Sequence, residues 1–156
     1  MIIRSIADLC LQYDEPLGLL RLEWASGPGT HTMRASAAQL LQLTRALKVH
    51  HLLIDLNTVP DIPLAEELWL GTHWLPGIVA LPLARLVLII ARDRVHNQLA
   101  IDALHDLAQP AIRFDAQYFD DSEAALIWLT DRSGRLPALR AEWAARHEPR
   151  PDQQKG

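Results

Sequence analysis

The chain has 156 residues, a formal net charge of -4 and one cysteine, Cys10. That length suits a single domain, since domains usually run to about 100–200 residues. The acidic balance and the presence of only two lysines, Lys48 and Lys155, disfavour nucleic-acid binding, which depends on clustered cationic side chains. The lone cysteine excludes an internal disulfide, and its apolar surroundings predict a small core residue rather than a reactive thiol.

No apolar segment is long enough to predict a membrane span. The longest apolar region, residues 69–84, is interrupted by His73, Pro76 and Pro82, whereas a span needs about 20 apolar residues. Arg4 and Asp8 interrupt the apolar N-terminus, so no signal peptide is expected. We therefore expect a soluble, cytoplasmic protein.

Strand and helix patterns alternate along the chain. Apolar runs of strand length recur, and the segments between them carry apolar residues at helical spacing. The helix after the third apolar run, for example, has Val95, Leu99, Ala103 and Leu107 on one stripe. In chain order we expect strands over 2–13 and 17–24, a helix over 33–49, a strand over 51–56, a helix from 64 to 76, a strand over 86–91, a helix over 95–107, a strand over 111–115, and helices over 120–130 and 138–147.

This alternation predicts an α/β fold with a mainly parallel sheet. The Pro-containing connection at Asp14-Glu15-Pro16 predicts an N-terminal hairpin, so a four- or five-stranded sheet should carry an antiparallel N-terminal strand. The α/β domain should span residues 1–133. A C-terminal helix at 134–148 and a disordered tail at 149–156 should follow.

The two faces of the predicted sheet differ in polarity. One set of strand positions is uniformly apolar, as at Leu52 and Ile54, whereas the other mixes charge with aliphatic residues, as at Arg21 and Asp55. A doubly wound sheet needs two apolar faces, so we expect helices mainly on one face and a one-way β-α superhelix. The second face should be partly covered by the first hairpin, the C-terminal helix or a second subunit. The candidates for a homodimer contact are Leu53, Val87, Ile89, Leu139 and Trp143.

The segment from His51 to Leu70 resembles the STAS domains, the fold shared by bacterial anti-sigma-factor antagonists and the cytoplasmic tails of anion transporters. An apolar strand ends at Asp55-Leu56, and a loop and a helix opening near Asp61 follow it. The chain is especially similar to the bacterial branch grouped with CRAL-TRIO lipid-transfer domains. That similarity lies in "LLIDL…E-x-L-W-L" at 52–70, the strand at 85–90, "D-x-x-H-N-Q" at 93–98 and the segment 123–129.

The resemblance implies a non-enzymatic regulatory or scaffolding domain that acts through contacts with an unknown protein partner. In that family a phosphorylated Ser opens the helix, within Asp-Ser-Ser-Gly. Here Asp61 matches the Asp, but Ile62, Pro63 and Leu64 replace the other three residues, so we expect the phosphoswitch to be absent. Thr58 is the nearby hydroxyl.

The alternative is a carrier for a small apolar ligand or lipid. Such a carrier needs a hydrophobic groove. Trp69 and Trp74 lie five residues apart, so an α-helix would place them on different faces, one in the core and the other nearer the surface. The candidate groove residues are Trp69, Trp74, Leu75 and Ile78.

Polar residues follow the expected carboxyl ends of the parallel strands, where α/β sheets bind ligands. One interpretation is a site for a partner or small anion, with Arg92 or Arg94 supplying the charge. The other is that these residues are helix caps and solvated loop positions, with Asp61 and Asp93 as N-caps. The candidates are Asp55, Asn57, Thr58, Asp61, Arg92, Asp93, Arg94, His96 and Asn97.

We expect no catalytic residues, no metal and no cofactor. Zinc needs three or four converging ligands, and the seven histidines show no such spacing. No Ser, Cys or Thr stands in a recognisable nucleophile motif, and Gly27-Pro28-Gly29 lacks the length and the Lys of a phosphate-binding loop. An enzyme is therefore the weakest interpretation.

Overall fold

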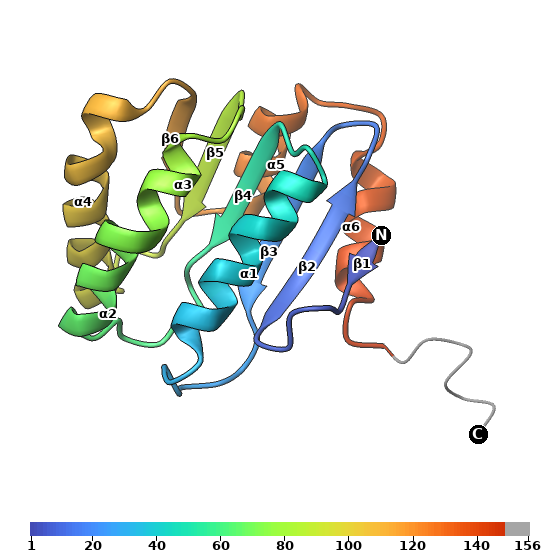
Figure 1. The fold of residues 1–156 in the computed structure, drawn as a ribbon. Coiled ribbons are helices and arrows are strands. Elements are labelled where there is room, and N and C mark those ends of the chain that lie inside the picture. The colour runs from blue at the N-terminus through green and yellow to red at the C-terminus, as the bar shows by residue number, and fades with distance from the viewer. Residues whose placement is uncertain (149–156) are drawn as a thin grey trace.

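Six strands form one sheet whose spatial order is the order of the sequence (Figure 1). The computed structural model describes residues 1–148, so the predicted disordered tail lies outside the described residues. β1 and β3 both pair antiparallel with β2, whereas β3 to β6 are parallel to one another. The α/β class and the mainly parallel sheet are confirmed, with six strands rather than four or five. The strands are β1 (Ile2–Ile3), β2 (Leu9–Asp14), β3 (Leu19–Trp24), β4 (His51–Asp55), β5 (Arg85–Ile89) and β6 (Asp115–Phe119).

The helices cover the two faces of the sheet unequally (Figure 1). Each parallel strand is added on the same side of the previous one, so right-handed crossovers place α1, α2–α3 and α4 on one face, as predicted. α5 and α6 lie on the other face. The helices are α1 (Met33–Ala46), α2 (Leu64–Trp69), α3 (Leu75–Val79), α4 (Val95–Ala108), α5 (Ser122–Thr130) and α6 (Leu136–Ala144), with a π-helical turn η1 (Leu70–Trp74) and a 3-10 turn η2 (Gln109–Ala111). Within residues 1–148, none of these helices has both the length and the apolarity to cross a bilayer.

Two predicted strands are displaced in the structure. The expected strand over 2–13 is divided into β1 and β2, because a turn around the buried Ile6 folds β1 back onto β2. The expected strand over 111–115 instead begins where it was predicted to end, at Asp115. The 3-10 turn η2 follows α4 directly and occupies the start of the predicted strand, and Phe114 packs on the core just before β6 begins.

The main core lies between the apolar face of the sheet and α1, α3 and α4. Leu20, Leu52 and Ile54 from the strands pack there with Leu40 from α1 and Ile78 from α3. All of them are less than one-tenth exposed. This is the face that the strand alternation marked as apolar.

The second face has its own core, formed with α5 and α6. Leu53, Val87 and Ile89 are 0–1% exposed and pack against Leu126 and Leu129 of α5. Leu139 and Trp143 of α6 are also buried, at 4% and 8% exposure. The prediction that these strand and helix residues make a dimer contact is therefore wrong, because the monomer itself buries them.

The charged residues of that face find partners near the C-terminus of the described chain. Arg146 donates to Glu23 at 2.7 Å, and the guanidinium groups of Arg21 and Arg146 lie over the ring of Trp143, at 4.2 and 4.3 Å from its centroid. Arg85 donates to the carbonyl of Trp128 at 2.6 Å. The charged residues of the strands thus lie on a face where α5, α6 and the residues after them supply their partners.

Candidate functional site

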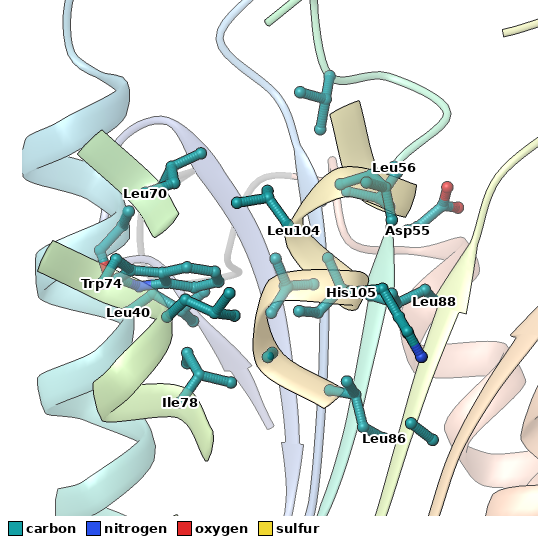
Figure 2. A pocket seen from close by; sticks show the side chains of 18 of the residues that line it. Leu40, Asp55, Leu56, Leu70, Trp74, Ile78, Leu86, Leu88, Leu104 and His105 are labelled. Atoms are coloured by element: carbon teal, nitrogen blue, oxygen red, sulfur yellow. The ribbon is translucent and has the colours of Figure 1, made fainter. Parts of the chain in front are cut away.

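An apolar cavity of about 170 Å³ lies between the sheet and helices α1, α3 and α4. Figure 2 shows Trp74 and Leu40 on one wall and Leu86 and Leu88 on the strand opposite. Leu88 is only half-buried, although its strand β5 is flanked by strands on both sides. The cavity over this side chain explains that exposure.

Small side chains on α4 and on the sheet account for the cavity. Helix α4 packs on η1 and α3. Beneath it the sheet offers the small Ala116, which pairs with Leu86 in the neighbouring strand, and α4 contributes the small Ala108. Short side chains on facing elements leave apolar space that nothing from the chain fills.

The ring of Trp74 is held in place at the cavity wall. Its indole Nε1 donates to the carbonyl of Ala37 in α1 at 2.7 Å, so the polar edge is satisfied and the apolar ring lines the cavity. Leu75 and Ile78 line it too, which agrees with the predicted groove. Trp69 does not belong to this lining; its ring lies 5.9 Å from that of His73.

The π-helical turn changes the phase of the tryptophans. In η1 the amide of Leu75 bonds to the carbonyl of Leu70, five residues back instead of four. This wider turn brings Trp69 and Trp74 onto the same apolar cluster, and both are half-buried. The expectation that one would be core and the other surface is wrong, because it assumed a regular α-helix.

The polar side chains that line the cavity all have partners inside the protein. Besides Trp74, the indole of Trp24 donates to the carbonyl of Gly27 at 2.7 Å, and the hydroxyl of Ser36 donates to Asp8. Asp55 accepts from the amide of Asn57 at 2.9 Å, and Figure 2 shows its carboxylate pointing away from the cavity centre. Burial raises the pKa of Asp55. The remaining partners are His105 with Tyr118 at 2.9 Å and Gln117 with Asp115 at 3.2 Å.

The His105–Tyr118 pair joins α4 to β6 beside the cavity. The hydroxyl of Tyr118 and Nδ1 of His105 form the hydrogen bond, and the two rings lie 5.6 Å apart. Burial raises the pKa of Tyr118 to about 12, with a contribution from Asp102 and Asp106. Tyr118 is 40% exposed, so this pair lies where the cavity meets solvent.

The polar residues predicted at the carboxyl ends of the strands mostly fasten the loop that follows β4. The side chain of Asn97 is 1% exposed. It accepts from the amide of Ile62 at 2.9 Å and donates to the carbonyls of Val59 and Pro60 at 3.1 Å each. This one amide therefore ties α4 to the loop, as a structural residue does.

Other residues of this polar set make similar contacts. Asn57 accepts from the amide of Ala91 at 2.7 Å, Arg94 donates to the carbonyl of Val59, and His96 bonds the carbonyl of Ile62 at 2.8 Å. Thr58, Asp61, Arg92 and Asp93 are exposed. Neither Asp61 nor Asp93 is an N-cap, because Pro63 and Arg94 occupy those positions without a side-chain cap. The geometry fits the interpretation as loop residues better than an anion site.

One group of potential metal ligands lies away from the cavity. Cys10 and Glu23 are cross-strand partners, and with His147 they place three ligand atoms within 4.8 Å of one another. Glu23, however, already holds the guanidinium of Arg146 at 2.7 Å. Burial also raises the pKa of the Cys10 thiol, which disfavours the thiolate that a metal needs. We assign no function to this group.

Sequence reasoning missed most of the cavity wall, including Leu88, His105 and Ala116. No periodicity marks a place where small residues of a helix and a strand leave space between them, and a half-buried Leu in a central strand is visible only after folding. No protein-family model, curated protein or solved structure matches the chain.

Proposed function

We propose that this chain binds a small, uncharged, apolar molecule in the cavity over β5. The observation that supports this most directly is the cavity wall, where aliphatic and aromatic carbon faces the space and each polar side chain already has an internal partner. A charged or strongly polar ligand would lose its hydration without gaining a hydrogen bond, which disfavours it.

The size of the cavity narrows the ligand class. An engineered apolar cavity of about 150 Å³ in another protein holds benzene. The 170 Å³ here suits one aromatic ring or a short alkyl chain. Each buried CH₂ group contributes about 0.8 kcal/mol, so a ligand of that size gains enough to bind without polar contacts. The proposal involves no chemical step and assigns no catalytic residue.

A matched pair of ligands tests this proposal. Toluene has the right size and no charge, whereas benzoate has the same ring and a carboxylate. Toluene at ten times its Kd should stabilise the full chain by about 1.4 kcal/mol in thermal or urea unfolding. Benzoate should have no effect at the same concentration. Equal effects of both, or none from toluene, would contradict an apolar binding site.

A second candidate function is a regulatory or scaffolding domain that acts through protein contacts. The resemblance to STAS domains in the segment from His51 to Leu70 supports it. Against it, α5 and α6 bury the second face of the sheet, which we expected to be only partly covered. The observation in its favour is the apolar surface that α2 and α4 leave exposed to solvent.

A further inference from the structure

Large exposed apolar side chains gather on two helices. Within residues 1–148, every exposed leucine belongs to α2 or α4, and Val95 of α4 is exposed with them. We call this set the α2–α4 surface; its members are Leu64, Leu68, Val95, Leu99 and Leu107, each 59–67% exposed. Contiguous apolar patches on monomers commonly mark contacts with other molecules.

The two helices present one surface rather than two. Leu64 of α2 and Leu99 of α4 line the same shallow hollow, together with Glu67 and His96. Further along α4, Leu107 lies against η1, since a Cβ placed on Gly71 would be 3.0 Å from its Cδ2 atom. Figure 1 shows α2 and α4 side by side at the β6 end of the sheet.

The charged residues of α2 and α4 are acidic; the nearby cations are Arg34, which is paired with Glu66 of α2, and Arg94, which precedes Val95. Glu67 lies in the hollow, and Asp102 and Asp106 are exposed on α4. In the part of the chain that the structure describes, no salt bridge involves any of the three. Neither residues 64–79 nor residues 95–108 include a lysine or an arginine.

The acidic charges indicate which kind of molecule could bind to this apolar surface. A second copy of the chain would bring acid against acid, which costs affinity. An anionic membrane would be repelled for the same reason. A cationic partner gains from both the apolar contact and the charges. α4 runs about 18 Å from Val95 to Leu107, at 1.5 Å per residue, which matches about three turns of a helix lying beside it.

We propose that the α2–α4 surface binds an amphipathic helix of a partner protein, with apolar residues toward Leu64, Leu68 and Leu99 and Lys or Arg toward Glu67 and Asp106. Helix-in-groove recognition uses such spaced apolar anchors. This inference rests on the second candidate function and names the chemistry of its partner. It does not depend on the cavity, which lies on the opposite side of α4.

A pair of synthetic helices of about 18 residues tests the proposal on the full chain. Both carry Leu on one face; one has Lys on the other face, and its counterpart has Glu at each of those positions. The Lys peptide should bind with at least tenfold higher affinity in calorimetry and should weaken as salt rises. In NMR spectra the amide shifts should be confined to α2, η1 and α4. Equal binding of both peptides, or of neither, overturns the charge argument.

Variants of exposed residues separate the contributions. Leu68→Ser combined with Leu99→Ser should weaken the Lys peptide at least tenfold without unfolding the chain. Asp106→Asn should weaken it severalfold, whereas the matched Glu15→Gln, which removes an exposed carboxylate elsewhere, should not. Unchanged affinity for the Lys peptide in the Leu variant overturns the proposal. So does a concentration-dependent dimer in sedimentation, or binding to phosphatidylserine vesicles, if the Leu variant abolishes it.

The cavity remains an independent readout. Toluene should stabilise the Leu68→Ser and Leu99→Ser variant as it stabilises the parent chain. Peptide binding without a toluene effect would leave the surface intact and contradict the cavity proposal alone. Stabilisation by toluene without peptide binding would leave the cavity proposal intact and contradict the partner-surface proposal alone.

Discussion

Filling the cavity from the sheet below should stabilise the fold and abolish ligand binding. Ala116 is half-buried in β6, lines the cavity and pairs with Leu86. Replacing it by Leu adds three carbons, which at about 0.8 kcal/mol per buried CH₂ sets an upper limit near 2.4 kcal/mol. Inserting carbon into a well-packed site costs about 1–3 kcal/mol instead. Because the cavity provides 170 Å³, we expect a net gain of about 1–2 kcal/mol.

Urea unfolding measures this change, with a higher midpoint and an unchanged slope. The stabilisation by toluene should disappear in Ala116→Leu. The control is Ala103→Leu, which adds the same carbons on the exposed side of α4 and should change stability by less than about 0.5 kcal/mol. A loss of stability in Ala116→Leu, or a toluene effect that survives it, would refute the reasoning that this space is open and binds ligand.

Three further predictions follow from single contacts. Arg135→Gln removes the partner that holds the pKa of Asp14 below its ordinary 3.8; it should lower the midpoint of urea unfolding at neutral pH, and the difference should shrink as acid protonates the folded carboxyl. Asn97→Ala leaves the amide of Ile62 and the carbonyl of Pro60 without a partner, whereas the carbonyl of Val59 keeps Arg94, so we expect a loss of roughly 2–3 kcal/mol and faster hydrogen exchange at the amide of Ile62. The pKa of Tyr118 is raised from 10.0 to about 12, so the phenol ionises at lower pH in the unfolded chain than in the folded one. The free energy of unfolding should therefore fall as pH rises between these values. Ultraviolet titration of the folded chain should show the late ionisation of this tyrosine.

The sheet could be predicted because its information is local. Apolar alternation in β4 and β5 marks strands and faces, and alternating helices fix the parallel order. The cover of the second face by α5 could not be predicted in the same way. Leu53 is buried by Leu126 and Leu129, which lie more than seventy residues later, and no local pattern records that contact. The charges on that face were correctly placed, and the C-terminal helix, one of its three predicted covers, lies there as α6, whereas α5 was not predicted to cover it.

The site was predictable only in part, for a different reason. Trp74, Leu75 and Ile78 were found because large apolar residues cluster in the sequence. The cavity itself arises where two small side chains, Ala116 in β6 and Ala108 in α4, leave space unfilled. The π-helical turn adds a second difficulty, since one extra residue per turn rotates every side chain after it. Neither unfilled space nor a shift in helical phase can be recognised from the periodicity of apolar residues in the sequence.

Helix α4 shows that periodicity can identify a helix without fixing which face is buried. The stripe of Val95, Leu99, Ala103 and Leu107 that predicted the helix is exposed in the structure. The structure buries Ala100, Leu104 and Ala108 instead. Asn97 lies on this inward side, and its three hydrogen bonds to the loop fix the rotation of the helix.

A pair of equivalent truncations tests which stripe faces inward. Leu99 is 65% exposed and Leu104 is 9% exposed, although the sequence offers no reason to treat them differently. Leu99→Ala should change the free energy of unfolding by less than about 0.5 kcal/mol. Leu104→Ala should cost about 2–3 kcal/mol, the lower part of the range for buried leucines, because one side of this residue already faces a cavity. Equal costs in urea unfolding, or a larger cost at Leu99, would mean that α4 is rotated, and both the ligand site and the partner surface would have to be abandoned.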